Sequence, residues 1–397
     1  MTKKKNLVPM ASPDLNQSDR NAVLDTLKTN YLSIGPKIKK FESMFCAYTG
    51  AKHAIGVSSG TAGLHLAVRA INIAQGDLVI TTPFSFVSST NVILFEKAIP
   101  VFVDIDPTTG NMNAEQVALA IKDLQSGSHS IRRKWLPRKG AENLGPLKSI
   151  LAVDVFGQPA DYDELQAIAQ AHDLVLIEDS CEALGAEYKN LPAGLMGDIG
   201  VFAFYPNKQI TTGEGGMIVT NNNQYANMMR ALRNQGRAPG DTWLQHTYLG
   251  YNYRLDEMSA ALGVSQMERI ENLLVMRQRV ADWYKTNLSK INEIELPTIA
   301  PATTRMSWFV YVIRLDKSID RNRAAESLIQ AGIPVRPYFL PIHLQPYMVE
   351  QFGFQTGDFP ATEDLGKRSL AIPFSGKMTR KQVDLVCEII EKVVTKL

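Results

Sequence analysis

Hydrophobic positions in the first half of the chain fall into short continuous runs, each ended by a turn or a polar cluster. Runs that do not alternate with polar residues are typical of strands covered on both faces, as in a parallel sheet. We therefore expect strands within residues 53–59, 77–84, 99–106, 149–157 and 173–180.

Between these runs, apolar residues recur with helical spacing, at residues 63–71, 112–124 and 162–172. Strands that alternate with helices predict an α/β fold, with a mostly parallel sheet flanked by helices. Ligands bind such sheets outside the carboxyl ends of the strands, so the residues that follow each strand are the first functional candidates.

The C-terminal part has a different pattern. A long stretch from Asp256 to about Ile291 carries helical apolar spacing, and residues 292–397 mix short strands with helices. This pattern predicts a smaller α+β domain after the main sheet. We place a large domain at residues 1–260 and a small C-terminal domain at 261–397.

Residues 126–148, SGSHSIRRKWLPRKGAENLGPLK, interrupt the alternation of strands and helices. They are polar, basic and rich in turn formers, which predicts a surface insertion. A solvated loop is the simpler interpretation, and contact with an anionic ligand is the alternative.

Composition excludes several classes of protein. The 397 residues are 45% hydrophobic and 21% charged, as in ordinary globular proteins, and the net charge of +2 provides no concentrated basic face for nucleic acid. No run approaches the roughly 18 apolar residues of a membrane span, and the basic start MTKKKNLVPM lacks the apolar stretch of a secretory signal. Cys46, Cys181 and Cys387 show no metal-ligand spacing, so we expect free thiols and a cytoplasmic location.

Candidate chemistry begins with the turn SSGTAG, which runs into a predicted helix. Backbone N–H groups at a helix N-terminus bind anions, so Gly60, Thr61 and Ala62 could hold a phosphate. The same residues also suit an ordinary helix cap formed by Ser59.

Two further strand ends carry chemistry-bearing side chains. Phe84 and Phe86 follow the second strand, where an aromatic ring is either part of the core or a stacking surface for a flat ligand. Glu178 and Asp179 end the run LIED, where a buried carboxylate is costly unless it is paired. Such a carboxylate could cap the next helix or hold a cationic ring nitrogen.

The stretch FAFYPNKQITTGEGG places Lys208 between an apolar run and a glycine-rich turn. An exposed loop lysine is the simpler interpretation of Lys208 alone. A phosphate turn, a stacking ring, a carboxylate and an amine are together the set that pyridoxal phosphate (PLP) needs. The lysine forms a Schiff base with its aldehyde, and the carboxylate keeps its ring nitrogen protonated.

Long motifs in a fixed order are distributed along the chain from residue 30 to residue 346: NYLSIGPKIKKFESMFCAYTGAKHAIGVSSGTAGLHLA, VDVFGQPAD, IEDSCEALGAEYKN, GDIGVFAFYPNKQITTGEGGMIVT, GYNYRLDEMSAALGVSQMERI and RPYFLPIHLQP. In these motifs the chain resembles the sugar aminotransferases of the DegT/DnrJ/EryC1/StrS family. The resemblance implies the aspartate-aminotransferase fold, which is fold type I of the PLP-dependent transferases.

The resemblance also implies roles. Lys208 matches the Schiff-base lysine, Asp179 the partner of the pyridine nitrogen, Phe86 the ring that stacks on the cofactor, and Gly60–Ala62 the phosphate-binding turn. Asn252 matches an asparagine that reaches the cofactor phosphate of the neighbouring subunit, which implies a homodimer with shared active sites.

Two positions depart from the family pattern. Glu182 stands where the family commonly has Gln or His near the cofactor's ring hydroxyl, and Ala203 stands where a serine often contacts the phosphate. Both departures bear on how the cofactor is held.

The implied activity is transfer of an amino group, with L-glutamate as the expected donor, to the keto group of a nucleotide-linked deoxysugar. One alternative is a PLP-dependent sugar dehydratase, which would have histidine in place of Lys208. Another alternative is an aminotransferase that acts on a cyclitol ketone without a nucleotide. A sensor without turnover would have lost the lysine or gained a recognition domain. A nicotinamide oxidoreductase would need a G-x-G-x-x-G turn, which SSGTAG does not supply.

Overall fold

The computed structural model of the chain describes residues 6–126 and 128–397. The lysines of the basic start, Lys3–Lys5, and Gly127 of the expected insertion lie outside the described residues.

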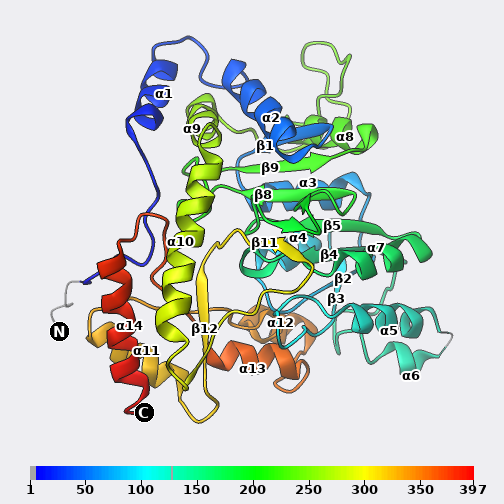
Figure 1. The fold of residues 1–397 in the computed structure, drawn as a ribbon. Coiled ribbons are helices and arrows are strands. Elements are labelled where there is room, and N and C mark those ends of the chain that lie inside the picture. The colour runs from blue at the N-terminus through cyan, green and yellow to red at the C-terminus, as the bar shows by residue number, and fades with distance from the viewer. Residues whose placement is uncertain (1–5, 127) are drawn as a thin grey trace.

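The centre of the molecule is a seven-stranded sheet with the order β1-β9-β8-β5-β4-β2-β3 (Figure 1). Its strands are β1 (His53–Val57), β2 (Leu78–Thr81), β3 (Ile99–Phe102), β4 (Leu147–Val153), β5 (Val175–Asp179), β8 (Ile199–Ala203) and β9 (Gly216–Thr220). Strand β9 pairs antiparallel with β1 and β8, and the other pairs are parallel. The expected mostly parallel sheet is confirmed.

Helices cover both faces of this sheet. One face packs against α3 (Gly60–Ala70), α4 (Ser88–Phe95) and α8 (Asn223–Arg233). The other face packs against α2 (Pro36–Thr49), α5 (Ala114–Gln125), α7 (Tyr162–Ala171) and α9 (Glu257–Met267).

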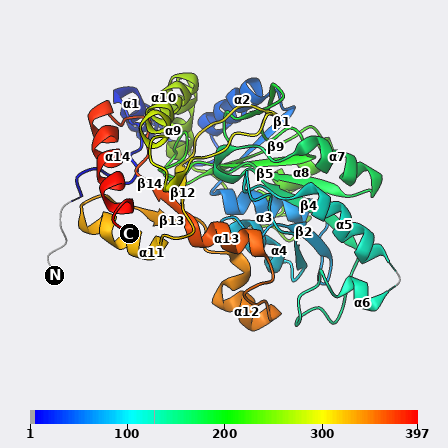
Figure 2. The ribbon, with the colours of Figure 1, turned by 60° about the horizontal axis from the view of Figure 1, so that its bottom comes forward.

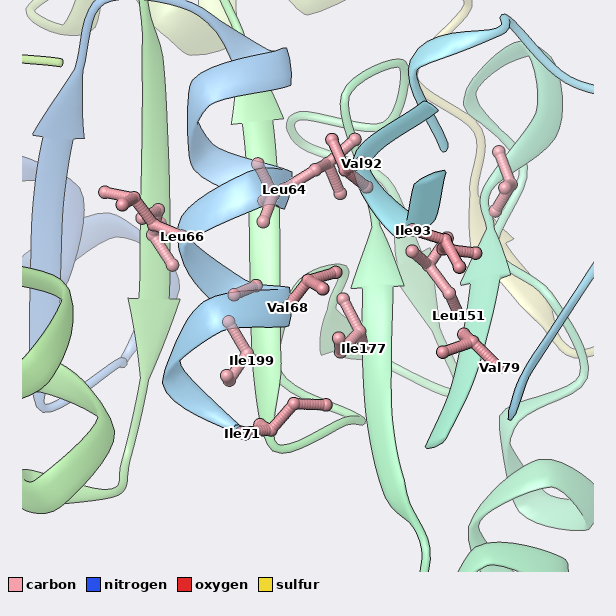
Figure 3. Packing of buried hydrophobic residues seen from close by; sticks show 14 of the residues in the cluster. Leu64, Leu66, Val68, Ile71, Val79, Val92, Ile93, Leu151, Ile177 and Ile199 are labelled. Carbon is pink, nitrogen blue, oxygen red and sulfur yellow. The ribbon is translucent and has the colours of Figure 1, made fainter. Parts of the chain in front are cut away.

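Because helices cover both faces of the sheet, the sequence of each strand is a continuous apolar run. Figure 3 shows Ile177 near Val68 of α3 and Leu151 near Ile93 of α4, on the face that these two helices cover. Their neighbours in the chain, Ile150 and Leu176, pack into the core on the opposite face because successive side chains of a strand point to opposite sides.

The stretch from Asp256 to about Ile291 forms two helices, α9 and α10 (Ile270–Leu288), instead of one continuous helix. The helices are separated at Arg269, whose backbone φ is −130°. Its guanidinium pairs with Asp14 and Asp19, at 2.8 Å each, and so anchors the break to the N-terminal segment. The apolar spacing alone did not reveal this change of direction, because it continues through both helices.

The C-terminal part is built on a four-stranded antiparallel sheet with the order β10-β12-β14-β13. Its elements are β10 (Ile294–Glu295), β12 (Tyr311–Leu315), α11 (Arg321–Gln330), β13 (Arg336–Pro337), β14 (Ser369–Ile372) and α14 (Arg380–Val394). Val280 and Leu288 of α10 belong to this core, together with Val8, whereas Ile270 and Leu274 pack on the large sheet. The division of the chain at residue 260 stays a prediction.

The remaining elements join or cover these two sheets. A three-stranded antiparallel sheet has the order β11-β6-β7. The elements are α1 (Gln17–Leu27), α6 (His129–Arg132), β6 (Glu187–Tyr188), β7 (Leu191–Pro192), β11 (Thr303–Arg305), α12 (Pro346–Phe352), α13 (Pro360–Arg368) and the short 3-10 helices Val155–Gly157 and Ile342–Leu344. None of the helices in the described ranges is long and apolar enough to cross a membrane.

Candidate active site

A cavity of about 420 Å³ lies at the carboxyl ends of β4, β5 and β8, where Val153, Asp179 and Ala203 line it. The position agrees with the rule for open α/β sheets. Of the residues singled out in the sequence, the cavity is lined by Gly60, Thr61, Phe86, Asp179, Glu182 and Lys208.

Lys208 is not an exposed loop lysine, because its side chain is only 12% exposed. Its Nζ lies 3.8 Å from Oε1 of Glu182 and 3.8 Å from the centroid of the Phe309 ring. The amine therefore lies inside the cavity, between a carboxylate and an aromatic face.

The loop that carries Lys208 is held by the buried side chain of Arg277. This guanidinium donates to the carbonyl oxygens of Asn207 and Lys208, at 3.1 and 2.5 Å, and also to those of Trp308 and Phe309, at 3.0 and 3.2 Å. Burial lowers the pKa of Arg277 to about 10, so it stays charged at neutral pH. Arg277 thus joins the lysine loop to the segment that supplies the Phe309 ring.

Asp179 and Glu178 are neighbours in β5 but serve different sides of the sheet. Asp179 lines the cavity, accepting a hydrogen bond from Oγ of Ser89 at 2.6 Å and one from the N–H of Cys181 at 3.2 Å. Glu178 is fully buried and accepts from the N–H groups of Gly194, at 2.8 Å, and Gly197. Only Asp179 is therefore available to a ligand in the cavity.

The turn into α3 is both a helix cap and part of the cavity wall. Ser59 is the N-cap residue, and its Oγ accepts from the N–H of Ala62 at 3.0 Å. Ala62 is buried behind the turn, while Gly60 and Thr61 line the cavity. A Cβ on Gly60 would lie only 2.7 Å from Cβ of Ala203, so glycine permits the close approach of this turn to β8.

The two phenylalanines after β2 lie in different environments. Phe84 is fully buried and packs edge-on against Phe156 and Phe339. Phe86 is 62% exposed and lines the cavity, which leaves its ring free to contact a flat ligand.

Glu182 is buried beside Lys208, and its Oε2 accepts from the N–H of Phe156 at 2.8 Å. Burial raises the pKa of Glu182 to about 7, although the Lys208 ammonium and the Phe156 N–H act in the opposite direction. This carboxyl group therefore changes its charge near neutral pH, next to the amine.

We expect Glu182→Gln to change how stability depends on pH in the cofactor-free protein. The ordinary pKa of glutamate is 4.5, so between this value and about 7 the folded chain holds a proton that the unfolded chain has released. The free energy of unfolding of the wild type should therefore fall as pH rises, by on the order of 1 kcal/mol per pH unit from about pH 5 to about pH 7, relative to the variant. Urea denaturation across this range measures the difference.

Glu164→Gln, on the exposed side of α7, is the matched control, because its stability should follow the wild type at every pH. Parallel curves for the wild type and Glu182→Gln would show that Glu182 does not take up a proton on folding.

Asn252 does not line this cavity within its own chain. It is exposed, and its backbone pairs with that of Asn234. The flanking rings of Tyr251 and Tyr253 stack on each other at 4.9 Å, and both contact His65 of α3.

Several lining residues were missed in the sequence. Tyr205 and Asn207 stand beside Lys208 within a motif already singled out, whereas Phe309, Tyr338 and Phe339 come from the C-terminal part. Tyr338 and Phe339 belong to the motif RPYFLPIHLQP, which carried the resemblance but did not place them at the site. All three rings are brought to the cavity by the packing of the second sheet, so no pattern near the strand ends points to them.

The residues of the cavity fit PLP. The site contains an amine, a hydrogen-bonded carboxylate, the first residues of a helix and an open aromatic ring. In addition, Oδ1 of Asn207, next to Lys208, is buried without a hydrogen-bond partner, as expected where a polar ligand group completes the site. Ala203 supplies no hydroxyl for a phosphate, whereas Thr61 and Ser88, which share a hydrogen bond at 2.8 Å, do.

Comparisons with known proteins agree with this geometry. GDP-perosamine synthase of Caulobacter vibrioides is 34% identical over 98% of both chains, and the spore coat polysaccharide biosynthesis protein SpsC of Bacillus subtilis is 32% identical over 99% of this chain and 98% of its own. The solved structure of PseC from Helicobacter pylori, an aminotransferase of pseudoaminic acid biosynthesis, superposes with a TM-score of 0.88 at 26% identity, covering 99% of this chain and 100% of PseC.

The sequence profile of one family matches residues 13–391, which is nearly the whole chain. Together with the amine, carboxylate and helix turn of the cavity, this match confirms the resemblance seen in the motifs. The chain belongs to the DegT/DnrJ/EryC1/StrS aminotransferase family and is a PLP-dependent aminotransferase.

Proposed function

We propose that this enzyme transfers an amino group from L-glutamate to the keto group of a nucleotide-linked deoxysugar, for use in polysaccharide biosynthesis. The observation that carries the proposal is the buried Lys208 amine facing Glu182 and Asp179 lining the same cavity. The choice of substrate is supported by relatives named for a GDP-linked product and for polysaccharide biosynthesis.

In this proposal Lys208 holds the cofactor covalently and moves the proton between the cofactor and substrate carbons. Asp179 holds the ring nitrogen, Phe86 covers one ring face, and the turn at Gly60 and Thr61 holds the phosphate. When bound, PLP carries the amino group and withdraws electrons from the carbon that loses its proton.

The test is a screen of substrates with the PLP-loaded enzyme and glutamate. Keto-deoxysugars linked to GDP, UDP or dTDP are offered, with a keto cyclitol as the non-nucleotide alternative, and release of 2-oxoglutarate is measured. At least one nucleotide-linked ketone should give an amino product by mass spectrometry, and Lys208→Ala sets the background. Amination of the cyclitol alone, or of no ketone above that background, would contradict the proposal.

We further propose a homodimer in which Asn252 of each chain reaches the phosphate site of the partner subunit. Asn252 is exposed. Residues 31–34 lie next to the segment that carries Asn252, because the backbone of Ser33 forms a bridge with that of Asp256. Apolar side chains that would otherwise face water are found in both regions and at the cavity mouth: Tyr31, Leu32, Ile34, Phe86, Tyr205, Trp243, Leu244 and Leu249. Exposed apolar groups of this number favour an interface.

Mixed dimers distinguish the shared site from a site within one chain. If sites are shared, a dimer of one Lys208→Ala and one Asn252→Ala subunit has one pocket with both defects and one pocket with neither. Random mixing in equal amounts should then restore about a quarter of wild-type activity, because half of the dimers are mixed and each has one intact pocket.

Differently tagged subunits verify that exchange has occurred, and each variant alone sets the background. If exchange is complete and activity stays at that background, Asn252 serves its own chain.

We also propose that the enzyme works in the cytoplasm. Cys46, Cys181 and Cys387 are all unpaired, which suits a reducing compartment.

A further inference from the structure

A second cavity, of about 430 Å³, lies between the basic insertion at residues 126–148 and the segment at residues 354–360. It shares no lining residue with the active-site cavity among the described residues. We propose that this second cavity binds a nucleoside diphosphate, at a site separate from the active site. Its size is within the range of about 300–1,000 Å³ that is typical of small-molecule sites.

The two walls of the cavity are joined by specific contacts. The guanidinium of Arg138, in the insertion, donates to both carboxylate oxygens of Asp358, at 2.6 and 2.7 Å. The N–H of Lys139 also donates to the carbonyl of Phe352 at 3.1 Å. A bidentate pair of this kind fixes geometry as well as distance. The insertion is therefore docked on the C-terminal part, and the cavity is a built feature of the fold. Figures 1 and 2 show where α6 of the insertion and α12 of the C-terminal part lie.

The cavity offers aromatic surface for a flat ligand. The half-buried rings of Phe359 and Trp135 line it and form its aromatic floor. Phe102, in β3, and Phe354 are buried, and the Phe102 ring packs at centroid distances of 5.3 Å from Phe354 and 5.8 Å from Phe359. Trp135 lines the insertion side and is oriented by its indole N–H, which donates to Asp123 at 2.9 Å. Aromatic side chains arranged in this way bind a nucleobase by stacking.

The charges of the cavity favour an anion. Its two carboxylates already have partners inside the protein: Asp358 is paired with Arg138, and Asp104 accepts from the N–H groups of Ala361 and Thr362 at 2.8 and 2.9 Å. The lining holds three cationic side chains, Arg133, Lys134 and Arg138, against these two carboxylates, so an anion in the cavity meets a net positive charge.

Two cations on the insertion side have no carboxylate partner among the described residues, although Nη1 of Arg133 donates to the carbonyl of Pro137 at 3.3 Å. Arg133 and Lys134 line the cavity, and neither forms an ion pair within the ranges that the structure describes. A phosphate group alone would leave the aromatic floor unused, and an apolar ligand would leave the cations unused. A nucleotide uses both, which is why we assign this class of ligand.

The test measures binding to the full-length, PLP-loaded enzyme by calorimetry, with GDP, UDP and dTDP as probes and inorganic pyrophosphate as the anion without a base. Because the active site is also proposed to take a nucleotide, the variant Arg133→Ala/Lys134→Ala isolates the second site. At least one nucleotide should bind the wild type at this site, and the double variant should weaken that binding about tenfold, as loss of two exposed cation–phosphate contacts predicts.

The matched control is Lys122→Ala/Lys139→Ala, which removes two cations near the cavity that do not line it. It should bind like the wild type. The same nucleotide should change the tryptophan fluorescence of the wild type more than that of Trp135→Phe. The difference between the two proteins reports binding at the second site, because any response of Trp308 beside the active site is common to both. Equal binding by the double variant and its control would overturn the proposal. So would binding of pyrophosphate as tight as that of the nucleotides, because the aromatic floor would then play no part.

Discussion

Replacing Lys208 by alanine is expected to lower the turnover number for aminotransfer by about a thousandfold or more. The Lys208 amine lies in the cavity at 3.8 Å from the Glu182 carboxylate, on a loop that Arg277 holds by two carbonyl oxygens. In the proposed mechanism the variant loses both the covalent attachment of PLP and the group that moves the proton. Steady-state turnover measures the loss, and borohydride reduction followed by peptide mapping locates the attachment.

Lys189→Ala is the matched control, because this exposed lysine pairs with Asp163 at the surface. It should keep wild-type turnover and the borohydride-fixed cofactor. A cofactor fixed to a lysine other than 208 in the wild type, or a Lys208→Ala enzyme that turns over normally, would refute the assignment.

Asp179→Ala should lower the turnover number by about a hundredfold or more, while the enzyme keeps most of its PLP. The carboxylate is held at the cavity wall by Ser89 and by the Cys181 N–H, at 2.6 and 3.2 Å, and we propose that it pairs there with a cationic ring nitrogen. Without this charge the cofactor ring accepts electrons less well, so the proton-transfer step slows. The enzyme should keep its PLP because the proposed phosphate turn and Lys208 are unchanged in this variant.

The readout for Asp179 separates chemistry from binding. An α-deuterated amino donor should show a larger isotope effect on turnover in the variant, and the PLP content should stay close to the wild-type value. Asp179→Asn removes the charge with little change of shape and should behave like Asp179→Ala. Wild-type turnover in either variant would exclude the role in holding the ring nitrogen.

Much of the large sheet was predictable from the sequence because its signals are local. Each buried strand appears as an apolar run of strand length, and each helix that covers the sheet has its own periodicity. The five expected runs correspond to β1, β2, β3, β4 and β5. The long apolar pattern after Asp256 was interpreted less well, since its break depends on the ion pairs of Arg269 with the distant Asp14 and Asp19.

The position of Lys208 could also be predicted, because it lies in a long motif after a buried strand. The separation of Phe84 from Phe86, and of Glu178 from Asp179, could not be derived from composition or periodicity alone. Members of each pair are near in sequence, and which of them faces the cavity depends on how the strand end and the following turn are packed.

The sequence by itself determined the α/β class and the family, and it pointed to the strand-end residues for which we propose catalytic roles. Only the tertiary structure decided what surrounds Lys208: the ring of Phe309, the wall of Tyr338 and Phe339, and the clamp formed by Arg277. The reason is physical. Local patterns report whether a segment is buried, but residues separated by many positions meet only when the second sheet packs against the first.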